Sequence, residues 1–220
     1  MKTILCYGDS NTYGCKPIGF DQLGEEVIAS DLRYGPEQRW PGILQKELGS
    51  GFRIIEEGLN GRTTVFDDPV EGVHKNGMTY LVPCLESHAP LDLVLLMLGS
   101  NDFKKKFSAS AYDIALGLGK LVDMIQGSGA GPGGSSPELL LMCPPPVGKL
   151  IQFALMFEGA GPKSEQLAGY LKKIAKQKGC HFMEVANVIE PSDTDGLHYE
   201  ESSHKILGQA VARYIESNIF

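Results

Sequence analysis

The sequence predicts a three-layer α/β/α sandwich built around a five-stranded parallel sheet. Five apolar runs have the length of strands, and segments with helical periodicity lie between them. The third run, residues 91–98, is almost continuously hydrophobic, as expected for a strand that helices cover on both faces. Strand and helix patterns that alternate along the chain are typical of doubly wound α/β proteins with right-handed crossovers.

The predicted elements follow one another in a regular order. The strands are residues 3–7, 52–56, 91–98, 138–143 and 181–185. A helix is expected to begin near Trp40, just before Pro41. Three later helices are predicted from apolar stripes at helical spacing, namely Ile114, Leu118, Leu121, Val122 and Ile125, then Leu167, Leu171 and Ile174, then Ile206, Leu207, Ala210, Val211, Tyr214 and Ile215.

Three segments fit neither pattern. Residues 18–38 form a long excursion, and residues 127–137, rich in Gly, Ser and Pro, are expected to be a flexible surface loop. Residues 144–162 are unusually apolar for a loop, so they are expected to cover a substrate pocket, a partner subunit or the sheet edge. None of them marks a domain boundary, and we expect a single domain over residues 1–220.

Composition narrows the classes of function. The chain has 220 residues, is 42% hydrophobic and 21% charged, and carries a formal net charge of −7. An acidic chain of this kind argues against nucleic acid as the main partner. No apolar stretch is long enough to span a membrane, and the first residues lead directly into a strand without a signal-like core. The expected location is therefore the cytoplasm.

The cysteines indicate neither disulfides nor a metal. They number five, and none forms a Cys-x-x-Cys pair or another metal-ligand spacing. We therefore interpret all of them as structural or incidental, and we expect no metal and no cofactor. Among the histidines, four have no carboxylate at a comparable spacing and are expected to be structural or exposed: His74, His88, His181 and His204.

A serine follows the first strand at a position suited to chemistry. Residues 8–14 read GDSNTYG, and Gly8 can end the strand while Asp9 or Ser10 caps a following helix. Ser10 would then project from the carboxyl end of a strand, where open α/β sheets bind ligands. Taken alone, the pattern favours a helix cap. A nucleophilic role requires a base, a group that orients the base, and donors for the oxyanion.

A candidate base and its orienting group lie just before the last helix. Asp195 precedes His198 by three residues, so one turn can bring the carboxylate onto the imidazole. Asp193 is a rival for the orienting role at a less direct spacing. The alternative is a simple helix start in which Asp195 is the N-cap and His198 is exposed.

Candidate oxyanion donors follow two other strands. Residues 58–63 contain two glycines whose backbone can approach a ligand closely, and Asn101, after the third strand, offers a side-chain amide. Each segment alone is also a plausible plain turn. All of these turns are expected at the same edge of the sheet as Ser10, which favours a shared site.

The four segments, in this order, resemble the blocks of the SGNH (GDSL) hydrolase family. They are residues 8–14, 58–63, 99–102 and 195–198. The resemblance implies a flavodoxin-like SGNH hydrolase fold with a catalytic triad of Ser10 as nucleophile, His198 as base and Asp195 as its orienting group. It also implies an oxyanion hole formed by the Ser10 N–H, the Gly61 N–H and Asn101.

A narrower resemblance is to the short-chain arylesterase/acyltransferase branch, also called perhydrolases. It is carried by residues 56–64, 91–94, 97–102, 113–117 and 157–159. Two departures concern the pocket: Asn11 stands where leucine is usual, and Tyr13 and Cys15 stand where the acyltransferase type has tryptophans. The smaller Cys15 is expected to widen or wet the acyl site, which weakens the expectation of efficient transfer in water. The full set of substrate-pocket candidates is Asn11, Tyr13, Cys15, Phe153 and Phe157.

The resemblance implies a metal-independent serine esterase that hydrolyses short-chain acyl or aryl esters through an acyl-enzyme on Ser10. Members of the branch can also pass the acyl group to alcohols or peroxide, and they form oligomers. Here the apolar segments 18–38 and 144–162 also favour a homo-oligomer. The same machinery would serve a carbohydrate O-deacetylase or a thioesterase. Alternatives of another class are a flavodoxin-like nucleotide-binding module and a non-catalytic assembly protein.

Overall fold

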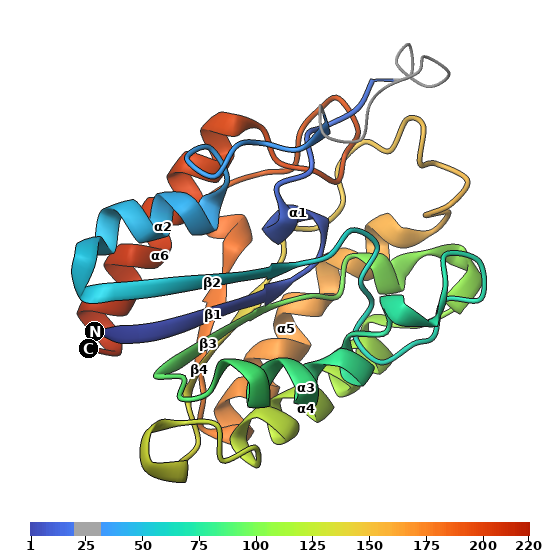
Figure 1. Cartoon of the computed structure of the whole chain (residues 1–220). Coiled ribbons are helices and arrows are strands. Elements are labelled where there is room, and N and C mark those ends of the chain that lie inside the picture. The colour runs from blue at the N-terminus through green and yellow to red at the C-terminus, as the bar shows by residue number, and fades with distance from the viewer. Residues whose placement is uncertain (20–31) are drawn as a thin grey trace.

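The computed structural model of the chain describes residues 1–19 and 32–220. Parallel strands form one sheet: β1 (Lys2–Gly8), β2 (Phe52–Gly58), β3 (Leu93–Met97), β4 (Glu138–Cys143) and β5 (His181–Glu184). Their order across the sheet is β2-β1-β3-β4-β5 (Figure 1). The five-stranded parallel sheet predicted from the sequence is confirmed.

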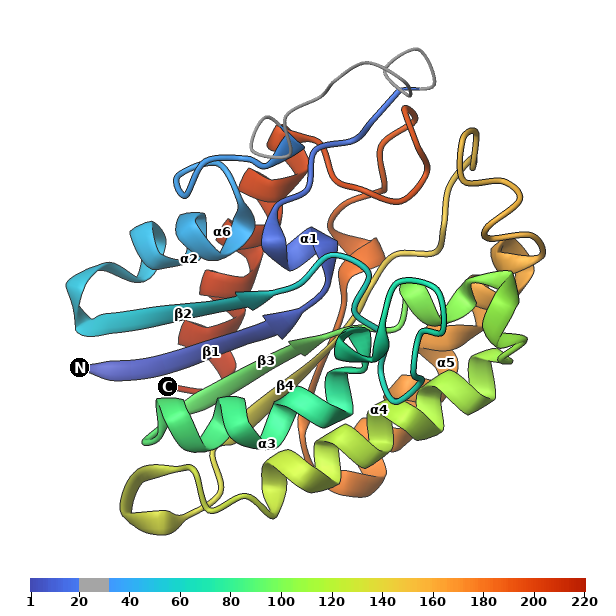
Figure 2. The same cartoon turned by 45° about the vertical axis from the view of Figure 1, so that its right-hand side comes forward.

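Helices cover both faces of this sheet. Those of the described residues are α1 (Ser10–Tyr13), α2 (Trp40–Leu48), α3 (Gly77–His88), α4 (Ala111–Gln126), α5 (Ala160–Lys178) and α6 (Glu201–Asn218). Figures 1 and 2 show α2 and α6 together on one face and α3, α4 and α5 on the other, while the short α1 lies at the carboxyl end of β1. The predicted three-layer α/β/α sandwich is confirmed.

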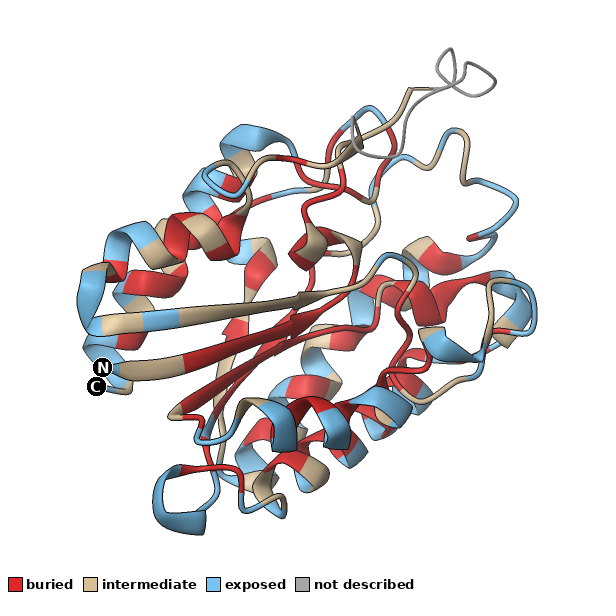
Figure 3. Ribbon diagram, in the orientation of Figure 1, coloured by how far each residue is buried: buried red, intermediate tan, exposed pale blue. Residues whose placement is uncertain are grey.

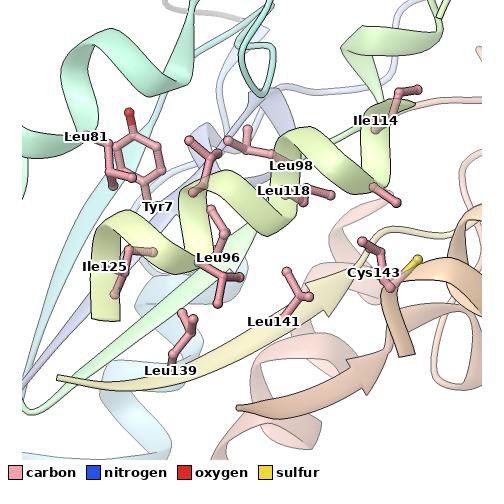
Figure 4. Close-up of a cluster of buried hydrophobic side chains, with 14 of the residues drawn as sticks. Tyr7, Leu81, Leu96, Leu98, Ile114, Leu118, Ile125, Leu139, Leu141 and Cys143 are labelled. Carbon is pink, nitrogen blue, oxygen red and sulfur yellow. The ribbon is translucent and has the colours of Figure 1, made fainter. Parts of the chain in front are cut away.

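The core consists of two apolar clusters, one on each face of the sheet. Alternate residues of β3 supply both: Val94 and Leu96 pack toward α3, α4 and α5, whereas Leu93 and Leu95 pack toward α2 and α6. Burial is concentrated on the strands and on the inner sides of the helices (Figure 3). Figure 4 shows part of the first cluster, in which Tyr7 of β1 contributes an aromatic ring. The continuous hydrophobicity of β3 thus reflects the burial of this strand on both faces of the sheet.

Helix α3 was not predicted from the sequence. It begins at Gly77 and contains Pro83, two features that obscure a helical pattern. Its N-terminus is fixed by Asn76, whose side chain accepts the Met78 N–H at 2.9 Å, and by the Tyr7 hydroxyl, which donates to Gly77 O at 2.7 Å. Tertiary packing therefore supplies the helix that local propensity does not.

Other predicted boundaries also change. The last helix begins at Glu201, so residues 195–198 form a separate turn, and α5 begins at Ala160, inside the segment 144–162 that was expected to be a loop. Within the predicted excursion 18–38, residues 20–31 lie outside the described residues. None of the described helices is both long enough and apolar enough to cross a membrane.

The strand order places the functional candidates at one edge. Strand β2 lies on one side of β1, whereas β3, β4 and β5 follow one another on the other side. The carboxyl ends of the neighbours β1 and β3 are therefore the topological switch point of the sheet. Ser10 follows β1, Asn101 follows β3, and Gly61 follows the adjacent strand β2. His198 follows β5, and its loop reaches the same edge.

Candidate active site

The turn after β1 presents Ser10 at the carboxyl edge of the sheet. A Cβ at Gly8 would lie 2.1 Å from Thr12 Oγ1, so this close approach requires glycine. Asp9 is the N-cap of α1, and its carboxylate accepts the Asn11 N–H at 3.0 Å. Ser10 is the first residue of the helix, so its interpretation as the cap is wrong and its hydroxyl is available for another partner.

Asp195 and His198 lie in a tight turn that holds the imidazole against Ser10. Asp195 Oδ1 accepts the N–H groups of Leu197 and His198, both at 2.9 Å. Asp195 Oδ2 lies 2.6 Å from His198 Nδ1, and His198 Nε2 lies 3.1 Å from Ser10 Oγ. Asp193 is exposed, and it is Asp195 that contacts the ring. The structure thus brings the three predicted residues into one hydrogen-bonded chain.

Asp195 and His198 shift each other's protonation. Burial raises the pKa of Asp195, but its hydrogen bonds with His198 and Leu197 and the charge of His198 together outweigh burial and leave the pKa below its usual value. Burial lowers the pKa of His198, but its interactions with Asp195 and with the nearby Cys15 together outweigh burial and leave the pKa above its usual value. His204 has no such carboxylate, and burial lowers its pKa to about 3. Its Nδ1 accepts the Trp40 N–H at 3.2 Å, so it is a structural histidine, as expected.

Hydrogen-bond donors gather on the same pocket as Ser10. Among the described residues, no acceptor takes the backbone N–H of Ser10 or of Gly61. Asn101 Nδ2 donates to Arg62 O at 3.2 Å, which occupies one of its two hydrogens and leaves the other available. All three residues line one pocket. This is the arrangement that can stabilise a developing oxyanion.

Residues without a predicted role fasten these donors in place. The buried Arg62 donates through Nη1 to Gly8 O at 2.8 Å, which ties the β2 loop to the end of β1. The buried Asp102 accepts the Thr64 N–H at 2.9 Å and the Thr64 hydroxyl at 2.5 Å, which ties the β2 loop to the β3 loop. Arg62 and Asp102 lie inside the sequence motifs, but only the fold reveals what they contact.

The pocket has a volume of about 270 Å³ and two chemically different sides. Its lining residues are Ser10, Cys15, Asn60, Gly61, Glu71, Ser100, Asn101, Lys104, Phe153, Met156, Phe157, Leu197 and His198. Phe153 packs edge-on against His198, with ring centroids 6.1 Å apart, and against Phe157 at 6.3 Å. Glu71 and Lys104 form an ion pair on the polar side.

Three of the five predicted pocket residues line this pocket, namely Cys15, Phe153 and Phe157. Asn11 and Tyr13 do not. The buried Asn11 instead donates through Nδ2 to Leu197 O at 3.1 Å, and so supports the loop that carries His198. The Tyr13 ring stacks under the Arg33 guanidinium at 3.8 Å. Helical geometry turns both side chains away from the opening after Ser10, which sequence position alone did not indicate.

One further contact was not predicted. The Ile18 N–H donates to Asp195 Oδ2 at 3.3 Å, and the Gln152 side-chain amide donates to Ile18 O. The carboxylate that holds His198 thus has a second donor from a segment 177 positions away. No sequence motif marks this contact.

Comparison with known proteins identifies the family. The profile of the GDSL-like lipase/acylhydrolase family matches residues 6–206, which include Ser10, Gly61, Asn101, Asp195 and His198. The chain belongs to this family. None of the curated proteins compared with it matches.

Solved structures agree closely with the GDSL hydrolase over almost its full length. A carbohydrate acetylesterase from Sinorhizobium meliloti is 39% identical, with a TM-score of 0.91 and 99% of each chain covered. The aryl esterase of M. smegmatis is also 39% identical, with a TM-score of 0.90 and 99% of each chain covered. A putative arylesterase from Agrobacterium tumefaciens is 33% identical, with a TM-score of 0.85, and covers 98% of this chain and 99% of its own.

Proposed function

We propose that this GDSL hydrolase is a serine esterase that hydrolyses short-chain acyl and aryl esters through an acyl-enzyme on Ser10. The observation that carries the proposal is the hydrogen-bonded chain from Asp195 through His198 to Ser10, with distances of 2.6 and 3.1 Å. Membership of an acylhydrolase family and similarity to esterase structures support it.

In the first half of the reaction, Ser10 Oγ attacks the ester carbonyl while His198 Nε2 takes the hydroxyl proton. Asp195 Oδ2 keeps the proton on Nδ1 and stabilises the imidazolium that forms. The carbonyl oxygen becomes an oxyanion, which would receive hydrogen bonds from the Ser10 N–H, the Gly61 N–H and Asn101 Nδ2. His198 then gives its proton to the leaving alcohol or phenol, and the acyl group stays on Ser10.

In the second half, water replaces the leaving alcohol. His198 Nε2 takes a proton from the water, whose oxygen attacks the acyl carbonyl, and the same donors hold the second oxyanion. The proton then returns to Ser10 Oγ as the carboxylic acid leaves. Every proton transfer thus uses one imidazole nitrogen, and no metal or cofactor is needed.

Pocket size favours small substrates. A volume of about 270 Å³ lies just below the usual range for ligand pockets, which is roughly 300–1,000 Å³. The apolar side, formed by Phe153, Met156, Phe157 and Leu197, suits a short acyl chain or an aryl ring. Transfer of the acyl group would follow the second half of the reaction, with an alcohol or peroxide attacking the acyl-enzyme in place of water. The small Cys15 side chain leaves room for water, which would compete with these acceptors.

A sugar acetate is a second candidate substrate, and the polar side of the pocket favours it. Lys104 is 4% exposed and pairs with Glu71, while its Nζ lies 3.9 Å from Asp68 Oδ2. These fixed charges, with Asn60 beside them, offer both donors and acceptors to sugar hydroxyls. A thioester would use the same three catalytic residues, but the polar side of the pocket offers it no additional contacts.

A panel of esters ranks these substrates. We expect turnover of p-nitrophenyl acetate to exceed that of p-nitrophenyl octanoate, because the longer chain does not fit. Acetylated xylose and an acetyl thioester test the alternatives, and assays with added alcohol or peroxide measure transfer against hydrolysis. Turnover of long acyl chains alone would overturn the proposal.

The nucleotide-binding alternative is less well supported. It would place a phosphate at the N-terminus of α1, a helix of only four residues, and would leave the contact between Ser10 and His198 without a role. Absorbance of the purified protein reports a bound flavin or nucleotide directly. A non-catalytic assembly protein is separated from an esterase by the Ser10→Ala variant discussed below.

We also propose that copies of the chain associate as a homo-oligomer. Within the loop after β4, Leu155 is 85% exposed, and Ile151 and Met156 are also exposed. A group of exposed apolar side chains is unusual on the surface of a soluble monomer. Sedimentation velocity measures the assembly, and Leu155→Glu is expected to weaken it. A monomeric wild-type protein would contradict this proposal.

A further inference from the structure

Strand β2 and helix α3 bring three metal-binding side chains together outside the active-site pocket. Glu57 lies near the end of β2, and Cys84 and His88 lie on α3. Their donor atoms all lie within 4.8 Å of one another, and no other such group of three occurs in the described part of the chain. We propose that Glu57, Cys84 and His88 form a binding site for a Zn²⁺ ion.

The fold explains why these side chains converge. Cys84 and His88 are four residues apart, so they lie on the same face of α3 one turn from each other. Glu57 pairs in register with Tyr7, and neighbouring residues in parallel register face the same side of the sheet. Tyr7 and Cys84 belong to the same core cluster, which places the Glu57 side chain beside α3.

The donor set suits zinc. A carboxylate oxygen, a thiolate sulfur and an imidazole nitrogen are common zinc ligands, whereas Mg²⁺ and Ca²⁺ prefer oxygen alone. On binding, the Cys84 S–H proton leaves to solvent as the sulfur–metal bond forms. Two anionic ligands and a neutral imidazole then balance the charge of the divalent ion, which limits the cost of burying it.

The geometry requires only local adjustment. His88 Nε2 lies 3.0 Å from Glu57 Oε1, close to the separation of about 3.4 Å expected for two ligands of one tetrahedral zinc ion. The His88 and Glu57 side chains are 26% and 21% exposed, so both can rotate toward the buried Cys84 sulfur. Their exposure also leaves the fourth position to water. The Tyr80 hydroxyl, 3.4 Å from Glu57 Oε1, can orient the carboxylate.

Such an ion would link the edge strand of the sheet to the end of α3. It would stabilise the folded chain by mass action, because the unfolded chain does not hold the three ligands together. The site revises the expectation of no metal drawn from the sequence. That expectation rested on the spacing of cysteines, whereas here each element contributes too few ligands to form a motif.

The test is a titration of the full chain with Co²⁺, followed by competition with Zn²⁺. We expect a sulfur-to-cobalt charge-transfer band that saturates at one ion per chain and disappears when Zn²⁺ is added. Cys84→Ser should abolish the band, and His88→Gln should weaken binding by about tenfold or more. Zn²⁺ should also raise the thermal unfolding midpoint of the wild type more than that of His88→Gln.

Matched cysteine variants locate the ion. Cys15→Ser removes the thiol beside His198, and Cys180→Ser removes a half-buried thiol between α5 and β5, so both should keep the band. A wild type without a saturable band would overturn the proposal. So would a band that survives Cys84→Ser, is lost in Cys15→Ser, or is unaffected by His88→Gln. Because His88 is partly exposed, its variant remains informative if Cys84→Ser does not fold.

Discussion

The carboxylate of Glu71 lies directly against the backbone of Gly61. A Cβ at position 61 would come within 2.4 Å of Glu71 Oε2, and Gly61 has a φ of +77°, which side chains rarely adopt. The other oxygen of Glu71 is held by Lys104. The polar side of the pocket thus lies against the proposed oxyanion donor, and a side chain at position 61 would have to displace Glu71.

Gly61→Ala should therefore lower activity more than stability. The new Cβ displaces Glu71 or shifts the Gly61 N–H, and loss of an oxyanion donor costs roughly 10²–10³-fold in kcat. Gly49→Ala is the matched control, because Gly49 has a φ of +70° and no atom within 4 Å of its Cβ position. Steady-state kinetics and thermal unfolding of both variants measure the difference. Equal effects of the two variants on activity would exclude a special role for Gly61.

Ser10→Ala should abolish ester hydrolysis while the fold survives. Removal of Oγ takes away the attacking atom and should reduce kcat by roughly 10⁴-fold or more. Ser202→Ala, at an exposed position on α6, controls for a serine substitution as such. Circular dichroism checks the fold. An unchanged rate in Ser10→Ala would show that Ser10 is not the nucleophile.

Asn101→Ala should lower kcat by about 10²–10³-fold and leave KM nearly unchanged, because the amide acts on the oxyanion of the transition state. The readout is the separate measurement of kcat and KM on p-nitrophenyl acetate. A loss of less than about threefold would remove Asn101 from the oxyanion hole.

Activity should fall as the pH is lowered, because a protonated His198 cannot accept the Ser10 proton. Since the hydrogen bonds of His198 raise its pKa above the usual 6.5, the loss should begin above the pH expected for a free histidine. Asp195→Asn removes the largest of the interactions that raise the pKa of His198, so the acid limb should move to lower pH while kcat drops by roughly 10³–10⁴-fold. The measurement is kcat/KM as a function of pH, and a flat profile between about pH 5 and 8 would argue against His198 as the base.

If the polar side of the pocket binds sugar hydroxyls, Lys104→Met should reduce kcat/KM for acetylated xylose by about tenfold or more. The same variant should change kcat/KM for p-nitrophenyl acetate little. Lys106→Met is the matched control, because Lys106 pairs with the same acidic residues, Asp68 and Glu71, but does not line the pocket. Lys106→Met should affect both substrates equally. Equal effects of Lys104→Met on both substrates would remove the argument for a sugar acetate.

The sequence by itself determined the layers of the fold and which residues meet at one edge of the sheet. Hydrophobic strands and amphipathic helices report which faces are buried, and that pattern is local, so the five strands and the helices α2, α4, α5 and α6 could be predicted. Turn motifs after the strands are local as well. Because parallel strands end at one edge, the convergence of Ser10, Asn101 and His198 followed from their order.

Only the tertiary structure decided what depends on contacts between distant segments. Helix α3, with Gly77 and Pro83, exists because its inner face packs on the sheet, not because of its propensity. Asn11 and Tyr13 lie outside the pocket because helix α1 turns them away, and Glu71 and Lys104 enter it from two different loops, one after β2 and one after β3. Spatial contacts of this kind have no period and no fixed spacing, so a single sequence cannot carry them.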